Sequence, residues 1–320
     1  MFCGICAYLI WSGVAIAQAT SESYPLRPVR VVVGLAPGGG TDIQTRLIAQ
    51  KLSEHLGRSF LVENRTGAGG TVAYAFVAKS PADGYTLLGV ASGYSITPAV
   101  FSRLSYDPVK DFDPVSLAIE APILLLVHPA VPVKNVSELI ALAKARPNAL
   151  DFGSAGHGTS THMAMELFKS MAGVRLVHVP YKGTGQALTD LLAGQIPVLF
   201  GNILSCLPYV KAGRLRALAV TSSKRSAAMP ELPSIAEAGV PGYNTTTWHG
   251  WLAPAGTSTA VVQRLSSEIA KVVRSPEVMQ KMSGDGGVAV GSTPEQFARH
   301  LVAEIARWRK VVRETGVQVE

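Results

Sequence analysis

Cysteine is scarce in this chain, which has only Cys3, Cys6 and Cys206 among its 320 residues. The first two lie in an N-terminal segment that we expect to be removed, so Cys206 would be the only cysteine left. A fold held together by disulfides is therefore excluded. No nearby sequence feature would lower the pKa of the Cys206 thiol, and we expect this residue to be a small buried side chain.

Charged residues are also few: Asp, Glu, Lys and Arg make up 16% of the chain, whereas hydrophobic residues make up 48%. This composition excludes an intrinsically disordered chain, because there is enough apolar surface to bury. The net charge is +7, but the basic residues are scattered, and no stripe of alternating basic and aromatic residues runs along the chain. We therefore expect no nucleic-acid partner.

Motifs for nucleotide, metal and nucleophile chemistry are missing. The sequence has no GxxxxGK[ST], GxSxG or HExxH pattern, and no GxGxxG pattern with its downstream acidic residue. His157 and His162 are five positions apart, a poor spacing for two metal ligands on one helix face. We expect no metal, no cofactor and no catalytic residue. An exported hydrolase that uses Ser154 or Ser160 with one of these histidines stays open as an alternative.

The N-terminal segment has the features of a signal peptide. Residues 1–19 carry no charge, contain an apolar stretch from Ile5 to Ile16, and end in Ala17-Gln18-Ala19, a small-x-small cleavage pattern. The basic residues that usually begin such a segment are absent. No later stretch reaches the roughly 18–20 apolar residues of a membrane-spanning helix. We expect cleavage after Ala19 and export to the periplasm.

Strand and helix patterns alternate along the rest of the chain. The β-branched run at 29–34 predicts a buried strand, and a glycine-rich turn and a helix ending at Gly57 follow it. A second series of this kind begins with a strand at 150–152, and later helices are predicted at 160–172, 203–211 and 294–315. The alternation predicts an α/β fold with two similar lobes, each with a mainly parallel sheet, and a ligand cleft between them.

Three glycine-rich turns precede predicted helices, at 37–42, 67–70 and 153–159. The first backbone N–H groups of a helix have no partner within the helix and lie at the positive end of its dipole. Such an end attracts an anion, and a carboxylate would fit. Tyr181 and Lys182 could add a hydroxyl group and an ammonium group. The three turns together favour capture of an anionic ligand.

Six motifs in order carry a resemblance to a known family. They are APGGGTD at 36–42, ENRTGAGG at 63–70, DGYTL at 83–87, GSAGHGTSTH at 153–162, HVPYKG at 178–183 and LRALAVT at 215–221. In this series the chain resembles the Bug family, the TctC-like extracytoplasmic solute-binding receptors of tripartite tricarboxylate transporters. The resemblance covers the chain almost end to end after residue 19.

The resemblance implies a Venus-flytrap fold of the type II periplasmic binding proteins. Lobe one would comprise residues 20–122 and 253–320, and lobe two residues 123–252, with the chain crossing near 122–129 and 248–252. A small carboxylate would be held between the lobes, and the closed, monomeric receptor would dock on membrane permease subunits. A ligand-binding sensor subunit of a signalling system stays open as another role.

The resemblance also implies a set of ligand-binding residues, transferred position by position. The set is Gly39, Gly40, Thr41, Asp42, Ala68, Gly69 and Ser92 from lobe one, and Ser154, Gly156, His157, Thr159, Tyr181 and Asn202 from lobe two. Two positions depart from the family pattern. His157 stands where the family commonly has Asn, and Ile196-Pro197-Val198 replaces a usual Val-Asp pair.

Overall fold

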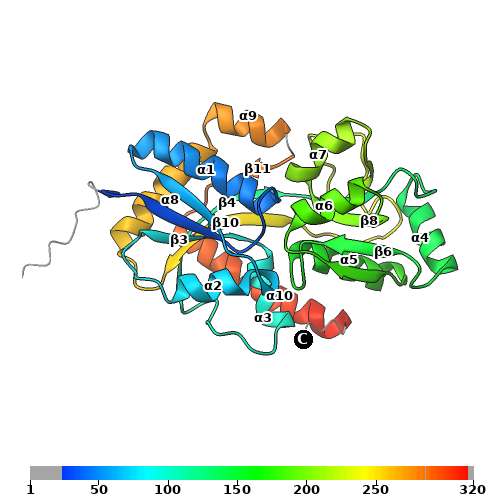
Figure 1. Cartoon of the computed structure of the whole chain (residues 1–320), viewed down its shortest axis with the longest axis horizontal. Helices are drawn as coiled ribbons and strands as arrows, with labels where there is room; N and C mark the ends of the chain where they lie inside the picture. The colour runs from blue at the N-terminus through cyan, green and yellow to red at the C-terminus, as the bar shows by residue number, and fades with distance from the viewer. Residues whose placement is uncertain (1–23, 285, 316–320) are drawn as a thin grey trace, which may run out of the picture.

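The computed structural model describes residues 24–284 and 286–315, and the expected signal peptide at 1–19 lies outside them. Two sheets lie side by side, each covered by helices on both faces (Figure 1). Strands from both ends of the chain form the six-stranded sheet, and strands from its middle form the five-stranded sheet. The structure is therefore a two-lobed α/β fold.

The first lobe contains the six-stranded sheet, in the order β11-β4-β10-β3-β1-β2. Its elements are β1 (Val29–Val33), α1 (Gly40–Leu56), β2 (Phe60–Asn64), η2 (Ala68–Gly70), α2 (Thr71–Ala78), β3 (Thr86–Ala91), α3 (Gly93–Val100), β4 (Phe112–Ala121), β10 (Thr247–Pro254), α8 (Thr259–Val273), α9 (Pro276–Gly284), β11 (Val288–Ala289) and α10 (Pro294–Thr315). Gly57 ends α1 in the left-handed conformation, as the sequence predicts.

The second lobe contains the five-stranded sheet, in the order β7-β6-β8-β5-β9. Its elements are β5 (Ile123–Val127), α4 (Val136–Ala145), β6 (Asp151–Ser154), α5 (Ser160–Ala172), β7 (Val177–Pro180), α6 (Thr184–Leu192), β8 (Val198–Asn202), α7 (Ile203–Lys211) and β9 (Arg216–Val220). Apolar side chains pack on both faces of this sheet, as they do in the first lobe.

Most strands of each sheet run in the same direction, as the sequence predicts, but both sheets are mixed. In the first lobe β10 runs antiparallel to β3 and β4, and in the second β5 runs antiparallel to β8 and β9. Each of these strands follows a crossing from the other lobe, so it begins at the edge near that lobe and runs away from it. The strands that run parallel to one another in each sheet end at the edge near the other lobe, and the helices that follow them begin at that edge.

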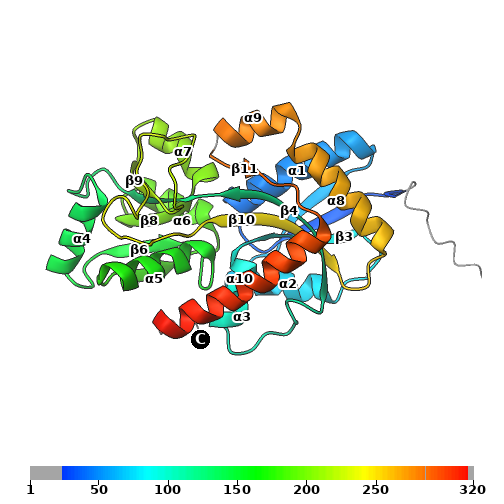
Figure 2. The same ribbon diagram turned by 180° about the vertical axis from the view of Figure 1, so that it is seen from behind.

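The chain crosses between the lobes along β4 and β10, which lie next to each other in the middle of the molecule (Figure 2). β4 leads through Pro122 directly into β5. The predicted boundary at residue 252 falls inside β10, which pairs only with strands of the first lobe. We propose that the lobes divide at Pro122 and just before Thr247.

The end of the chain also joins the lobes. α10 begins against the sheet of the first lobe and extends beneath α5 of the second (Figures 1 and 2). Trp308 of α10 packs with Ile96 and Val100 of α3 and with Met163 of α5 in one buried apolar cluster. Among the described residues, no helix is both long enough and apolar enough to cross a membrane.

Candidate ligand-binding site

The two lobes touch where their strand-to-helix loops meet. The backbone N–H of Ala36 in the first lobe donates to the carbonyl oxygen of Lys182 in the second at 2.9 Å. Several contact positions are glycine, and a Cβ at Gly69 would overlap the carbonyl oxygen of His157. A Cβ at Gly185 would lie 2.9 Å from the carbonyl oxygen of Pro37. Glycine at these positions allows the two backbones to approach closely.

Helices from opposite lobes meet at their N-terminal ends. A Cβ at Gly40, the first residue of α1, would lie 2.9 Å from side-chain atoms of Asn202, which immediately precedes α7. A Cβ at Gly93, the first residue of α3, would lie 3.2 Å from the Cα of Thr159, which precedes α5. Positive ends of helix dipoles therefore face one another across the contact, an arrangement that an anion between them would stabilise.

The capping of these helices agrees with an anion-binding role. In α4, far from the other lobe, Asn135 accepts a hydrogen bond from the backbone N–H of Glu138. In the described structure, the residues before α1, α3, α5, α6 and α7 make no such side-chain capping bond; they are Gly39, Ser92, Thr159, Gly183 and Asn202. Backbone donors at these five helix ends are thus left for another acceptor, as they also are at the start of α8, where Ser258 makes no capping bond.

Several buried polar atoms have no hydrogen-bond partner among the described residues. Thr41 Oγ1, Gln44 Oε1 and Asn202 Oδ1 lie at or beside the start of α1, and others lie elsewhere, including both ring nitrogens of His249 on β10. His249 lies on β10 opposite Ala91, the last residue of β3. A buried polar atom without a partner costs about 1–3 kcal/mol, so such a group is a place for bound water or a polar ligand.

A cavity of about 220 Å³ opens beside this contact between the lobes. Lobe one contributes Gly34, Leu35, Gly67, Ala68, Gly69, Gly70 and Phe101 to its wall, and lobe two contributes Ala155, Gly156, His157, Pro180, Tyr181 and Lys182. Five of the predicted ligand-binding residues therefore line one cavity. The Tyr181 hydroxyl donates to Asp190 Oδ2 at 2.7 Å, and burial together with this carboxylate raises the tyrosine pKa to about 12.

The sequence profile described as "Tripartite tricarboxylate transporter family receptor" matches residues 44–317. This chain belongs to that family. The receptor is 35% identical over 319 residues to "Protein BugT" of Bordetella pertussis, which covers 98% of this chain and 96% of the relative. The comparison confirms the resemblance found in the sequence.

Solved structures of related proteins have the same fold as the receptor. "R. palustris Rpa4515 with adipate" superposes with a TM-score of 0.89 at 42% identity, covering 92% of this chain and 98% of that one. "MatC (Rpa3494) from Rhodopseudomonas palustris with bound malate" superposes with a TM-score of 0.87 at 33% identity, covering 90% and 100%. Both titles name a dicarboxylate bound to the relative.

The other predicted residues of the receptor are buried where the lobes meet. They line no part of the 220 Å³ cavity and lie behind or beside it. These residues are Gly39, Gly40, Thr41, Asp42, Ser92, Ser154, Thr159 and Asn202. The hydroxyls of Ser92 and Ser160, from different lobes, both donate to Thr247 Oγ1, at 3.1 and 3.4 Å. Thr247 begins β10, so this hydroxyl group joins both lobes to the crossing strand.

Asp42 has a structural role in the receptor. Its carboxylate accepts hydrogen bonds from Arg46 Nε at 3.0 Å, from Asn64 Nδ2 at 2.9 Å and from the backbone N–H of Gly38 at 3.1 Å. Burial alone would raise the pKa of this carboxyl, but these hydrogen bonds outweigh burial and hold the pKa below its ordinary value. An ionised carboxylate would repel an anionic ligand, so we propose that Asp42 shapes the turn at 37–42.

Ser154 is paired with a histidine that sequence reasoning overlooked. Its Oγ lies 2.6 Å from His178 Nε2, whereas the hydrolase alternative named His157 or His162 as the base. Burial, followed by the neighbouring His157 and Lys169, lowers the pKa of His178. Ser154 is fully buried, and no carboxylate among the described residues hydrogen-bonds to the His178 ring. This pair lacks the accessible nucleophile and the orienting acid of a hydrolase.

A third histidine, which the spacing of His157 and His162 could not show, joins these two in the receptor. His157, His162 and His178 come together in lobe two, and one nitrogen of each lies within 4.8 Å of the others. Sequence spacing on one helix could not show this, because His178 lies on β7, beside β6. The parallel pairing of Gly153 with Val179 places the start of the glycine-rich turn next to this strand.

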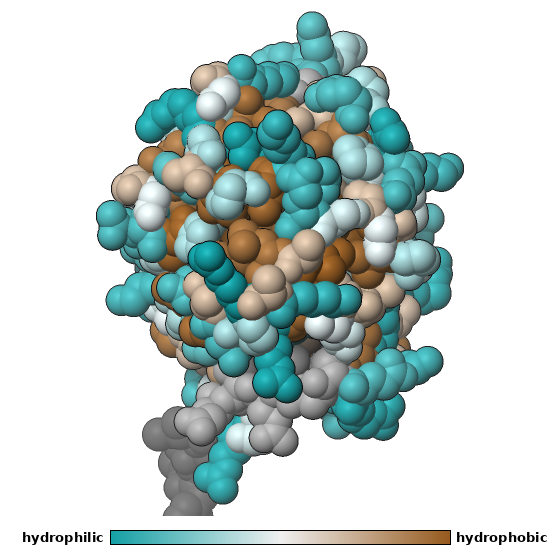
Figure 3. Space-filling model, turned by 90° about the vertical axis from the view of Figure 1, so that its right-hand side faces the viewer, coloured by the Kyte–Doolittle hydropathy of each residue, from teal (hydrophilic) through white to brown (hydrophobic). Residues whose placement is uncertain are grey.

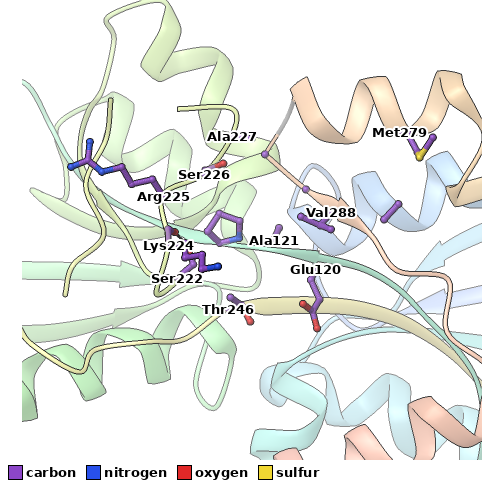
Figure 4. Close-up of a pocket in the computed structure, with 14 residues that line it drawn as sticks. Glu120, Ala121, Ser222, Lys224, Arg225, Ser226, Ala227, Thr246, Met279 and Val288 are labelled. Carbon is purple, nitrogen blue, oxygen red and sulfur yellow. Dashed lines mark hydrogen bonds between the residues drawn. The ribbon is translucent and has the colours of Figure 1, made fainter. Parts of the chain in front are cut away.

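The receptor has two further cavities that contain none of the predicted ligand-binding residues. One, of about 490 Å³, lies where the chain crosses between the lobes at Ala121 and is lined by apolar groups such as Met279 and Val288 and also by Lys224 (Figure 4). Glu120 contributes a carboxylate to its wall, and Arg225 extends away and is bonded to Glu237 at 2.8 Å. The other, of about 320 Å³, lies at the outer end of lobe two, onto which Figure 3 looks.

Proposed function

We propose that the receptor captures a small carboxylate between its lobes and delivers it to the membrane permease of a tripartite transporter. The observation that carries the proposal is the meeting of uncapped helix N-termini from both lobes at one contact, beside buried polar atoms that lack partners. Two of the turns that form these ends, at 37–42 and 153–159, are those for which the sequence predicts anion binding.

The negative charge of the bound acid would allow the two lobes to close. α1 and α3 face α7 and α5 with like dipole ends, so bringing the lobes together without an anion costs electrostatic free energy. A carboxylate placed between them accepts hydrogen bonds from the free backbone N–H groups and removes that cost. Capture needs no bond to be made or broken, and we propose that the receptor has no catalytic step.

Short dicarboxylates are the first ligands to test, because Rpa4515 and MatC are described with adipate and with malate. The cavity of about 220 Å³ has room for a molecule of that size. Its wall offers glycine backbone, Tyr181 and the exposed Lys182. We propose that the acid enters through this cavity and that one carboxylate reaches the helix N-termini behind it.

Export of the receptor, permease docking and a monomeric state are part of the same proposal. Family membership supports export and a membrane partner. A receptor that opens and closes can act as a single chain. A sensor subunit would use the same capture step, and only the protein that receives the closed form would differ.

A melting screen tests the proposal. The chain is unfolded, freed of small molecules, refolded and melted with adipate, with malate and with the neutral diamide of each. A ligand that binds only the folded state at a hundred times its Kd adds about 2.7 kcal/mol of stability. We expect an acid, and not its amide, to raise the melting temperature. Equal shifts from acid and amide, or no shift from a broader carboxylate panel, would contradict anion capture.

A further inference from the structure

Three imidazole side chains come together in the wall of lobe two. His157 lies in the loop between β6 and α5, His162 in the first turn of α5, and His178 on the edge strand β7. One nitrogen from each ring lies within 4.8 Å of the other two. His157 also lines the 220 Å³ cavity, whereas His162 and His178 lie behind it. The group is therefore reached from the cleft.

The two inner rings carry no charge at neutral pH. Burial lowers the pKa of His162, and the neighbouring His178, His157 and Lys169 lower it further. Burial also lowers the pKa of His178, with smaller contributions from His157 and Lys169. A neutral imidazole has a free lone pair, which is the form that binds a metal ion. His162 and His178 therefore need not lose a proton before they bind a metal ion.

A carboxylate and a hydroxyl lie in the second layer around the rings. Nε2 of His162 is 3.7 Å from Glu166 Oε1, and its Nδ1 accepts the backbone N–H of Gly158 at 3.2 Å. The lone pair is therefore on Nδ1, where a bound ion would replace the hydrogen bond from Gly158, and the Nε2 proton lies toward Glu166. Carboxylates behind histidine ligands are common in metal sites and fix the ring orientation. Glu166 also pairs with Lys169 at 2.8 Å, so this ammonium group is balanced.

The distances between the ring centres can be compared with those expected when the rings bind one ion. With metal–nitrogen bonds of about 2.0–2.1 Å, each ring centre lies about 3.2 Å from the ion, and ligand angles of about 100–130° separate two ring centres by about 4.9–5.8 Å. The observed separations from His157 are 4.9 Å to His178 and 5.7 Å to His162. His162 and His178 are closer, at 4.0 Å, and stack within 14°.

One ring must therefore turn before all three can bind. An ion cannot lie in the planes of two stacked rings at once. His162 is only 4% exposed, whereas His178 is half-buried on an edge strand, so His178 is the ring to turn, and its stacking on Phe152 at 4.8 Å would be lost as well. His157 is exposed in a glycine-flanked loop and can move toward the ion. The turn releases the contact between His178 and Ser154 and leaves the serine hydroxyl beside the site.

We propose that His157, His162 and His178 bind one divalent zinc ion in the wall of the cleft. Three neutral imidazoles are the ligand set of many zinc sites with one open position, and late first-row ions prefer nitrogen to carboxylate oxygen. The ion would tie the loop at 155–159 to α5 and β7. This loop forms one wall of the carboxylate cavity, so a bound ion would hold that wall in place.

Zinc binding to the untagged chain tests the proposal. After treatment with a chelator, the protein is titrated with zinc by calorimetry, and with cobalt while visible absorption is recorded. We expect one ion per chain and the intense absorption of tetrahedral cobalt. His157→Ala and His178→Ala should each weaken zinc binding at least tenfold. His128→Ala is the matched control, since His128 lies in the same lobe outside the cluster and should leave binding unchanged.

Three results would overturn the proposal: no zinc bound to the wild-type chain, unchanged binding in His157→Ala, or an equal loss in His128→Ala. The His157 side chain is exposed, so His157→Ala decides the question even where His178→Ala fails to fold. The melting screen with carboxylates runs without zinc, so failure of the metal site and failure of acid capture are separate outcomes.

Discussion

Replacing Gly40 by alanine should weaken closure of the two lobes without lowering the stability of lobe one. Gly40 is the first residue of α1, and a Cβ there would lie 2.9 Å from Cβ, Cγ and Nδ2 of Asn202 in the other lobe. Alanine is a better helix residue than glycine by up to about 1 kcal/mol, so lobe one should not lose stability. The contact between the lobes, however, would be overpacked.

The size of the effect follows from that overpacking. An extra methyl group in a close-packed contact costs about 1–3 kcal/mol, and under the proposed capture step only the closed form would contain this contact. The affinity for a captured acid should therefore fall about 5- to 150-fold. The acid that gives the largest shift in the melting screen is titrated by calorimetry into wild type and variant, and the variant without ligand should melt at or above the wild-type temperature.

Gly39→Ala is the matched control for this experiment. Gly39 is the preceding residue, and its Cβ would have no neighbour closer than 3.6 Å, with Ala36 and Thr184 at that distance. Its backbone is extended, with a φ of −80°, so alanine fits without strain. We expect an affinity within about threefold of wild type, since no atom need move. Wild-type affinity in Gly40→Ala would show that binding does not bring α1 against Asn202.

Three further outcomes follow from buried polar groups. Burial lowers the pKa of His249 to about 3, so as pH falls below about 6.5 this histidine takes up a proton in the unfolded chain before it does so in the folded one. Between pH 7 and pH 5 the free energy of unfolding should therefore fall by about 2 kcal/mol more in wild type than in His249→Leu. Urea-unfolding free energies that fall equally in the two proteins over this pH range would refute this. Asp42→Asn removes a buried charge that Arg46 faces, and urea unfolding should show a loss of about 1–3 kcal/mol; an unchanged midpoint would argue against the structural role. Burial raises the pKa of the Cys206 thiol to about 12, so a thiol reagent should modify it only in denaturant, and rapid modification of the native chain would contradict its burial.

The sequence pattern was most reliable where apolar residues recur at helical spacing. The helices predicted at 160–172, 203–211 and 294–315 are observed with those bounds as α5, α7 and α10. α3 was not predicted, because its sequence GYSITPAV begins with glycine and contains Pro98. Six of its eight residues are buried, so packing holds this helix where local preference would not. Long-range contacts of this kind are invisible in a local pattern.

β4 was missed for a related reason. Its sequence FDPVSLAIEA contains Pro114 and two acidic residues, which break the alternation expected of a strand. The strand is long because β10 pairs with it from end to end, with two shifts in register. Its partner is more than a hundred positions away in the chain. The crossing between the lobes therefore depends on a pairing that neither segment predicts alone.

The site shows the same division between local and long-range information. Each glycine-rich turn could be assigned to a helix N-terminus from its own residues. That Gly40 meets Asn202, and that His178 joins His157 and His162, depends on how the lobes and strands pack. A parallel pairing of the strand before residue 154 with the strand that contains His178 would have indicated the histidine cluster, because it places their ends at one sheet edge.

The facing helix ends explain why such a receptor would discriminate by charge before shape. Each unneutralised helix end interacts with a nearby charge by about 0.3–1 kcal/mol, and burial increases this value. Side-chain caps would satisfy the free N–H groups and remove the preference, as Asn135 does for α4 outside the contact. We propose that the lobes keep an unfavourable contact that a carboxylate would relieve and a neutral molecule of the same size would not. Selection among acids would then depend on the wall of the cavity, which His157 lines.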